Sequence, residues 1–204
     1  AVLVEDFGSV DTHKLSDVDT PSPNSDEVLI DIHAIGINFP DTLMMQGLYQ
    51  TKPEQPFTPG RDVAGTISAV GENVTGFKVG DRVMAIVPWG AYAEQCLALP
   101  ARCFHLPSDV DYVTAAGMAT VYMTSWVALM ERGGYQPGEK VLILGASGGV
   151  GLAAVQIAKA HGAFVVGGSS SESRGKIVLE NGADAIVDLS VADINENLRQ
   201  QVFE

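Results

Sequence analysis

The sequence predicts an α/β protein in which an irregular β domain is followed by part of a parallel βαβαβ sheet. Residues 1–108 contain short β-rich runs between turns rich in Gly, Pro, Asp and Asn. From Asp109 the apolar residues take up helical spacing. Strands of the fully buried type then alternate with amphipathic helices to the last residue. We therefore expect two domains, over residues 1–108 and 109–204.

Composition limits the functions that the chain can have. It has 204 residues, 46% of them hydrophobic, which is ample for a packed core. Its 12 basic and 25 acidic residues give a formal net charge of −13, which repels nucleic acid and anionic membranes. The sequence shows neither a basic leader nor an apolar run near the ~20 residues of a membrane span. We expect a cytoplasmic protein with no nucleic-acid or membrane partner.

The cysteines and histidines favour neither a disulfide framework nor a zinc site. Cys96 and Cys103 are the two cysteines, and neither lies in a CxxC motif. Without a secretory signal, two thiols are more often reduced and buried than paired. The four histidines are isolated in the sequence, so a structural metal site has little support.

The first part is expected to contain strands bounded by turn residues and one short helix. The strands cover residues 1–7, 27–38, 62–71, 81–87 and 91–99. In VLIDIHAI (28–35) alternate residues share one face, which is typical of a half-buried strand. One or two helical turns follow at 41–47, with Pro40 in a first-turn position where its missing N–H is not needed.

The second part is expected to alternate between helices and buried strands. A long helix, capped by Asp109 or Asp111, ends at Gly133-Gly134. There follow, in order, a strand at 141–146, a helix at 148–163, a strand at 163–169, a helix at 171–183, a strand at 184–190 and a helix from 191. This order is that of one half of a Rossmann domain. A dinucleotide-binding domain has two such halves, so we expect it to be incomplete in this chain.

A glycine-rich turn joins the first buried strand to the next helix. Residues 146–151, ASGGVG, fit the pattern G-x-G-x-x-G with alanine in the first place. In this context the pattern predicts a pyrophosphate site, because Gly148 admits the ligand, Gly151 allows close packing and the helix N-terminus supplies free N–H groups. A tight turn without a nucleotide is the alternative. The expected cofactor-binding residues here are Ala146, Ser147, Gly148, Gly149, Val150 and Gly151.

The end of the next strand indicates which dinucleotide binds. A fold that prefers NAD carries an Asp or Glu there for the ribose hydroxyls. This chain reads FVVGGSSSESR, with Ser169 at that place and Arg174 shortly after it. Serines and an arginine can donate hydrogen bonds to a 2′-phosphate. We therefore expect NADPH, the alternative being that Arg174 is an ordinary solvated residue of the helix.

Several blocks of the sequence resemble one family. They are NFPDTLMMQGLYQTKPEQPFTPGRDVAG (38–65), VGDRVMAI (79–86), GAYAEQC (90–96), GASGGVGLAAVQIAKAHGA (145–163) and KIVLENGAD (176–184). Together they resemble the zinc-independent quinone oxidoreductases, the zeta-crystallin-like branch of the medium-chain dehydrogenase/reductase superfamily. The resemblance implies a GroES-like β domain followed by a Rossmann domain, an active site in the cleft between them, and a homodimer.

The same resemblance implies that no metal is bound. Zinc alcohol dehydrogenases of this superfamily place a Cys in the segment GIC and a His in the block GHE. This chain has Asn38 and Arg61 at those places, and the third ligand region around Thr120 offers no thiol. Without such ligands there is no Lewis acid for an alcohol, so alcohol dehydrogenation is not expected.

Two residues of the first block, and Thr124 in the segment YMTSW (122–126), resemble residues that surround the reacting groups in that family. Asn38 resembles a polar residue near the nicotinamide, Tyr49 a tyrosine facing the substrate cleft, and Thr124 a threonine beside the nicotinamide. Their roles would be orientation and hydrogen bonding, because the nicotinamide carries the reaction. We take Asn38 and Tyr49 as catalytic and Thr124 as cofactor-binding. The purely structural alternatives are a turn residue, a packing aromatic and a helix residue bonded to its own backbone.

The expected activity is NADPH-dependent hydride transfer to quinones or related activated carbonyls and alkenes, with a small-molecule acceptor as the partner. Leu43 stands where several relatives have a tyrosine, so the acceptor is left open. Leu189 stands where they have another tyrosine, which weakens the contact on the adenine side of the cofactor. A 2-enoyl thioester reductase, similar to an acryloyl-CoA reductase, is the alternative among enzymes because one fold serves both. A non-catalytic NADPH-binding structural protein is the alternative of another class.

Overall fold

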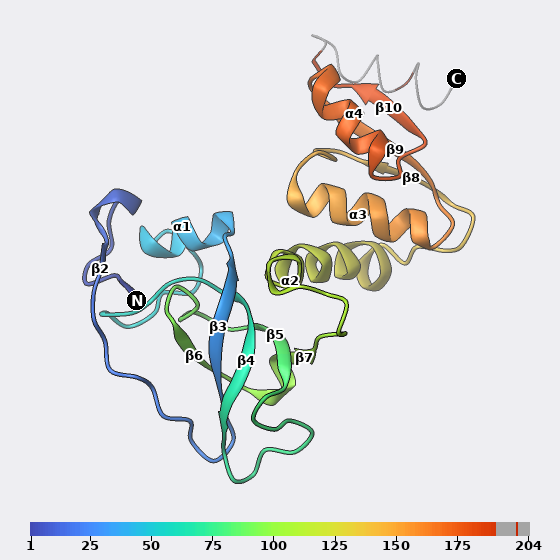
Figure 1. Ribbon diagram of the computed structural model, residues 1–204. Coiled ribbons are helices and arrows are strands. Elements are labelled where there is room, and N and C mark those ends of the chain that lie inside the picture. Colours follow the sequence, from blue (N-terminus) through green and yellow to red (C-terminus); the bar gives the residue numbers. More distant parts are fainter. Residues whose placement is uncertain (191–198, 200–204) are drawn as a thin grey trace. The chain divides into compact units, whose positions relative to one another are not determined.

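The structure is a computed structural model that describes residues 1–190 and residue 199 (Figure 1). It contains two compact units, Ala1–Thr120 and Val121–Glu204, and the division falls inside helix α2 (Tyr112–Trp126). The helix expected from residue 191 lies, apart from residue 199, outside the described residues. The expected α/β fold class, with an antiparallel β part followed by a parallel-sheet part, is confirmed.

An antiparallel sheet forms the first unit, in the order β6-β3-β4-β5-β7 (Figure 1). Its strands are β3 (Val28–Gly36), β4 (Asp62–Val70), β5 (Arg82–Ile86), β6 (Gln95–Ala98) and β7 (Cys103–His105). The alternation expected for β3 is absent at its start, where Val28, Leu29 and Ile30 are all buried. It appears from residue 32 on, where Ile32 and Ala34 are half-buried and His33 and Ile35 are exposed.

The expected strands at the ends of this unit are partly wrong. Residues 1–7 contribute only β1 (Val2–Leu3), which pairs with β2 (Lys14–Leu15), because Val4 bonds instead to Phe57. The strand expected at 91–99 shrinks to β6, because the N–H groups of residues 91 and 92 bond to carbonyls of the loop at 59–60. Strand β7 is absent from the sequence expectations, since three residues are too few to show a pattern.

Two helices of this region form where the sequence expects them. Helix α1 (Phe39–Met45) has Pro40 in its first turn. Helix α2 is capped by Asp111, whose Oδ1 accepts the Thr114 N–H at 2.8 Å. A π-helical segment, Val127–Arg132, continues α2 as far as Gly133.

The continuous helix Tyr112–Arg132 corrects the expectation that no apolar run approaches the length of a membrane span. Its 21 residues contain a window of mean hydropathy 1.3, so by length and composition it could cross a membrane. This is weak support for a membrane span, because a core helix of a soluble protein can pass the same test.

The first half of α2 packs closely on the sheet of the first unit. Ala64 of β4 forms a small buried cluster with Ala115 and Ala116. A Cβ at Gly36 of β3 would overlap the Ala116 carbonyl oxygen. Small side chains on both sides thus let the helix approach β3 and β4. This approach brings Thr120 to the first residue of β4, Asp62.

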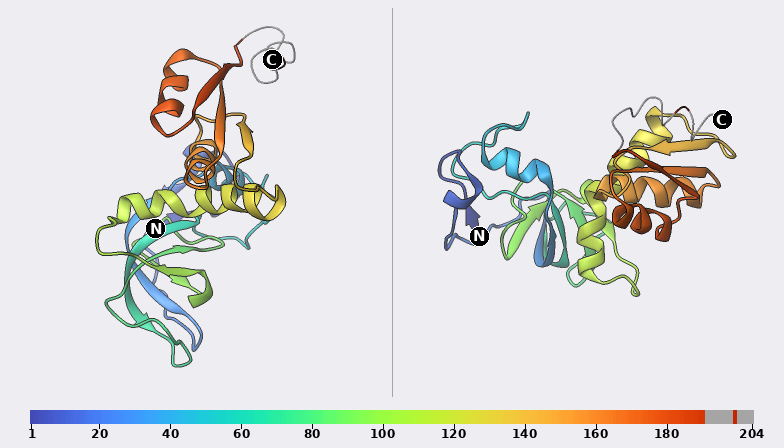
Figure 2. Two further views of the ribbon diagram at one scale, coloured as in Figure 1. Left: turned by 90° about the vertical axis from the view of Figure 1, so that its right-hand side faces the viewer. Right: turned by 90° about the horizontal axis from the view of Figure 1, so that it is seen from above.

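A parallel sheet forms the second unit, in the order β10-β9-β8. Its elements are β8 (Lys140–Ile143), α3 (Gly149–Ala160), β9 (Phe164–Ser169), α4 (Glu172–Glu180) and β10 (Ala185–Asp188). Both helices pack against these strands, as the two views of Figure 2 also show. The expected βαβαβ order is confirmed, and each βαβ step joins neighbouring parallel strands. Strand β8 ends at Ile143, so the glycine turn begins earlier than expected.

Candidate functional site

A buried carboxylate, Asp62, ties the predicted catalytic residue Asn38 to helix α2. Asp62 is 2% exposed. It accepts hydrogen bonds from Asn38 Nδ2 at 3.0 Å, from the Thr120 N–H at 3.1 Å and from Thr120 Oγ1 at 2.6 Å. Only the nitrogen end of an amide can donate to a carboxylate, so Asp62 determines which end of the Asn38 amide faces it. The second N–H of that amide has no acceptor among residues 1–190 and remains for another group.

A second buried carboxylate, Asp41, holds the start of α1. Its Oδ2 accepts the Asn38 main-chain N–H at 2.8 Å and the Tyr92 hydroxyl at 2.9 Å. Burial raises the pKa of the Asp41 carboxyl above its ordinary value. Burial, together with the neighbouring Asp41 charge, also raises the pKa of the Tyr92 hydroxyl. The Tyr92 hydroxyl therefore stays protonated at neutral pH and donates a hydrogen bond to Asp41.

The predicted catalytic residue Tyr49 follows α1 and meets Arg61. Arg61 Nη1 donates a hydrogen bond to the Tyr49 hydroxyl oxygen at 3.3 Å. The N–H of Tyr49 bonds to the Leu43 carbonyl of α1, which fixes the turn that carries the ring. Arg61 and Asp62 are consecutive in the sequence. One dipeptide therefore forms hydrogen bonds to both predicted catalytic residues, of which Asn38 precedes α1 and Tyr49 follows it.

The structure thus brings Asn38 and Tyr49 into one polar cluster. The residues of this cluster that the sequence analysis did not assign to a function are Asp41, Arg61, Asp62, Tyr92 and Thr120. The signal that could have found two of them is the block PGRD, in which adjacent charges directly precede a buried strand. Residues 1–190 contain no group of three or more His, Cys, Asp or Glu side chains that could hold a metal.

In the second unit, the glycine turn lies at the N-terminus of α3. A Cβ at Gly151 would overlap the Gly145 carbonyl oxygen and lie 2.7 Å from Ala146 Cα. A Cβ at Gly148 would meet only that same oxygen, at 3.5 Å. Packing therefore requires Gly151 to be glycine, whereas Gly148 leaves the outer side of the turn open. The first N–H groups of a helix have no partner within it, so this exposed turn fits a phosphate group.

The other predicted cofactor residues of this unit differ in exposure. Ser169 is 4% exposed, and its hydroxyl donates to the Ser171 carbonyl at 3.0 Å. Ser171 caps α4 by accepting the Arg174 N–H at 3.4 Å. The Arg174 side chain is exposed and forms no ion pair within the described part of the chain. Thr124 lies on an exposed part of α2.

Comparison with known protein families shows which family the chain belongs to. The sequence profile described as "Alcohol dehydrogenase GroES-like domain" matches residues 24–132. The chain belongs to this family, within the medium-chain dehydrogenase/reductase superfamily. A second profile, described as "Zinc-binding dehydrogenase", matches residues 149–202. The resemblance stated from the sequence is confirmed.

Individual proteins that are similar to this chain support the same family. The human quinone oxidoreductase is 42% identical over the whole chain, which spans 63% of that protein's length. The crystal structure of Escherichia coli quinone oxidoreductase complexed with NADPH superposes with a TM-score of 0.91 at 30% identity, over 98% of this chain and 61% of that one. The CurK enoyl reductase superposes with a TM-score of 0.89 at 30% identity, over 98% and 62%. The chain thus spans less than two thirds of the length of these relatives.

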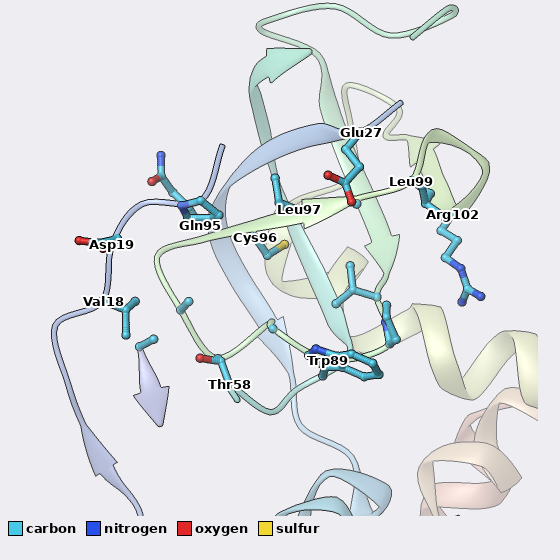
Figure 3. Close-up of a pocket in the computed structure, with 17 residues that line it drawn as sticks. Val18, Asp19, Glu27, Thr58, Trp89, Gln95, Cys96, Leu97, Leu99 and Arg102 are labelled. Atoms are coloured by element: carbon cyan, nitrogen blue, oxygen red, sulfur yellow. The ribbon is translucent and has the colours of Figure 1, made fainter. Parts of the chain in front are cut away.

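The first unit also contains a hollow of about 550 Å³, and Figure 3 shows residues that line it. Trp89, Cys96, Leu97 and Arg102 are among its lining residues, and neither Asn38 nor Tyr49 is. Burial raises the pKa of the Cys96 thiol to about 12, so this thiol is not a nucleophile at neutral pH. Both cysteines are buried and free, as the sequence predicts.

Proposed function

We propose that the protein is an NADPH-dependent, zinc-independent oxidoreductase that reduces quinones or related activated carbonyl or alkene acceptors by hydride transfer. The observation that carries the proposal is the Asn38 amide, held by buried Asp62 with one N–H left for an acceptor. Family membership and the likeness to quinone oxidoreductases support the same reaction.

The glycine turn is the part of the chain that would hold the cofactor's pyrophosphate. Residues 146–151 give an open turn at a helix N-terminus, and the exposed Arg174 would bind the 2′-phosphate of NADPH. Ser169 would support this site indirectly, by building the turn before α4. Thr124 would lie beside the nicotinamide. The bound cofactor supplies the hydride, which no side chain can do.

Asn38 would stabilise the acceptor oxygen that gains negative charge. An N–H donor fixed before the reaction needs no reorganisation when that charge develops. The neighbouring Ile37 and Phe39 are 79% and 74% exposed, and Leu48 beside Tyr49 is 69% exposed. Each predicted catalytic residue is therefore flanked by an accessible apolar side chain, which favours a planar, mostly apolar acceptor such as a quinone.

A 2-enoyl thioester reductase is the second candidate, and the likeness to the CurK enoyl reductase favours it. A thioester carbonyl would use the same Asn38 donor, because its oxygen also gains charge when the conjugated alkene accepts hydride. The two candidates thus share a site and a cofactor and differ in the acceptor that fits.

The remaining expectations belong to the same proposal. The net charge of −13 supports a protein without a nucleic-acid partner. We propose a cytoplasmic homodimer, with no membrane partner, as the working form of the protein; the sequence resemblance supports this assembly.

Oxidation of NADPH by the protein expressed from its complete reading frame tests the proposal. The reaction is followed with 1,4-benzoquinone and, separately, with crotonyl-CoA and acryloyl-CoA. Turnover of benzoquinone is the expected result. Turnover of the thioesters alone would replace the quinone activity with the second candidate. Binding of NADPH without turnover of any acceptor would show a non-catalytic binding protein.

A further inference from the structure

A buried hydroxyl of helix α2, that of Ser125, bonds to the first turn of α3. The Ser125 side chain is buried, and its Oγ donates a hydrogen bond to the Val150 carbonyl oxygen at 2.7 Å. Val121 lies on the same face of α2, four residues before Ser125. It packs against the same turn, because a Cβ at Gly149 would lie 3.3 Å from Val121 Cγ1. The end of α2 therefore lies against the residues that begin α3 (Figure 1).

The carbonyl that Ser125 holds belongs to the same peptide group as the Gly151 N–H. A peptide group is planar and trans, so its C=O and its N–H point in opposite directions and turn together. The N–H groups of residues 149–151 have no acceptor among residues 1–190, whereas the Leu152 N–H bonds to the Gly148 carbonyl at 2.8 Å. The Gly151 N–H is thus one of the groups left for a phosphate, and its direction depends on the Ser125 hydrogen bond.

We propose that Ser125 is a positioning residue for the cofactor, which acts on the pyrophosphate through the peptide group of residues 150 and 151. This inference rests on the proposed function, since it takes the glycine turn as the cofactor site. A peptide group that is already held in the bound orientation loses less freedom when the ligand arrives. NADPH and NADH both carry the pyrophosphate, so Ser125 should strengthen the binding of both by the same factor.

Packing between the two helices is the competing explanation for the Ser125 hydroxyl, and Tyr122 allows the two explanations to be separated. Its hydroxyl donates a hydrogen bond to Gln156 Oε1, so it also joins α2 to α3. Gln156 lies about two helical turns beyond the start of α3 at Gly149. Tyr122→Phe therefore removes a hydrogen bond between the same two helices and leaves the peptide group of residues 150 and 151 untouched.

The test is calorimetric titration of the protein, expressed from its complete reading frame, with NADPH, NADH and adenosine 2′-monophosphate, which has no pyrophosphate. We expect Ser125→Ala to bind NADPH and NADH about 5- to 10-fold more weakly and adenosine 2′-monophosphate as the wild type does. Tyr122→Phe should bind all three ligands with wild-type affinity. Ser125→Thr keeps the hydroxyl, so it should bind them within about twofold of wild type, although its extra methyl group lowers the thermal stability.

Alanine adds no atom at this buried position and favours a helix, so Ser125→Ala should fold, as thermal unfolding will show. Wild-type affinity for NADPH in Ser125→Ala overturns the inference and leaves the proposed function standing. Equal losses of NADPH affinity in Ser125→Ala and Tyr122→Phe also overturn it, because packing would then be the cause. The same holds if Ser125→Thr loses as much affinity as Ser125→Ala, or if adenosine 2′-monophosphate is weakened as much as NADPH. A wild-type protein that binds neither NADPH nor NADH overturns both the inference and the proposed function.

Discussion

The Tyr92 hydroxyl donates to Asp41 Oδ2 at 2.9 Å and is the one side-chain donor recorded for this fully buried carboxylate among residues 1–190. The Tyr92 ring lies against Gly60, where a Cβ would overlap it. The positive φ of Gly60, +90°, also favours glycine there. The hydroxyl is therefore brought to Asp41 by ring packing that does not depend on the hydrogen bond.

Tyr92→Phe should lower the free energy of unfolding by about 1–3 kcal/mol, because the buried Asp41 carboxyl loses one of its two donors to Oδ2 while the ring packing is kept. Urea denaturation measures the change. Tyr135→Phe is the control, since that hydroxyl bonds to the His161 carbonyl at an exposed site and its loss should stay within about 0.5 kcal/mol. Equal losses of unfolding free energy in the two variants would show that the hydrogen bond between Tyr92 and Asp41 stabilises the protein no more than an exposed one does.

The raised pKa of Asp41 makes a prediction about pH. A carboxyl whose pKa is raised by folding stabilises the protein fully below its ordinary value of 3.8, and this contribution is lost as the pH rises through the folded pKa. Asp41→Asn should therefore gain stability relative to wild type as the pH rises from about 3.8 towards neutrality. Urea denaturation across this range measures the difference.

Asp184 provides the control of opposite sign. A hydrogen bond from Lys159 lowers the pKa of Asp184. The stability that Asp184 contributes is present above its ordinary pKa and lost as the pH falls through the folded pKa. Asp184→Asn should lose stability relative to wild type as the pH rises, the reverse of Asp41→Asn. The same slope for both variants would rule out burial as the cause of the Asp41 effect.

Much of the fold could be predicted from local patterns, and the polar cluster could not. Strand β3, helix α1 and the glycine turn each carry a pattern within a few residues, so their sequence alone indicates them. The bond between Asp41 and Tyr92 joins residues 51 apart in the chain, and the bonds between Asp62 and Thr120 join residues 58 apart. Such pairs depend on how strands and helices pack together, which a single sequence does not reveal.

The residues of the candidate site likewise divide into those that the sequence could predict and those that it could not. Asn38 and Tyr49 could be selected because their block resembles a known family. In the sequence, Arg61 indicated only that a zinc ligand is missing; its contact with Tyr49 required the folded chain. The direction of the Ser169 hydroxyl, toward the Ser171 carbonyl, was likewise set by a turn whose geometry the residues GGSSS do not specify.

Two glycines of the turn before α3 should respond differently to alanine. Gly151→Ala should lower the thermal stability, because its Cβ would overlap the Gly145 carbonyl oxygen. Gly148→Ala should unfold as wild type does, since its φ of −81° suits alanine and its Cβ has room. We nevertheless expect Gly148→Ala to weaken NADPH binding about tenfold or more, because the methyl group would stand where the phosphates approach.

Thermal unfolding and fluorescence titration with NADPH measure the two effects. Wild-type NADPH affinity in Gly148→Ala would mean that the ligand does not approach this side of the turn.

Arg174→Ala should weaken NADPH binding about 10- to 100-fold and change NADH binding little, because a charge-assisted hydrogen bond to the 2′-phosphate is lost only with NADPH. Titration of both nucleotides measures the difference. Lys176→Ala, at another exposed cation of α4, is the control and should change neither affinity strongly. An equal loss for NADPH and NADH would show that Arg174 does not recognise the 2′-phosphate.

The most direct measurement is the rate of NADPH oxidation with 1,4-benzoquinone by the wild-type protein and by Asn38→Ala, both expressed from the complete reading frame. We predict turnover by the wild type. In Asn38→Ala, kcat should fall about 100-fold or more while NADPH binds as before, because the donor to the developing oxyanion is gone. A wild-type protein that binds NADPH and reduces no quinone, carbonyl or activated alkene would contradict the proposed reaction, and an unchanged kcat in Asn38→Ala would contradict the role of Asn38.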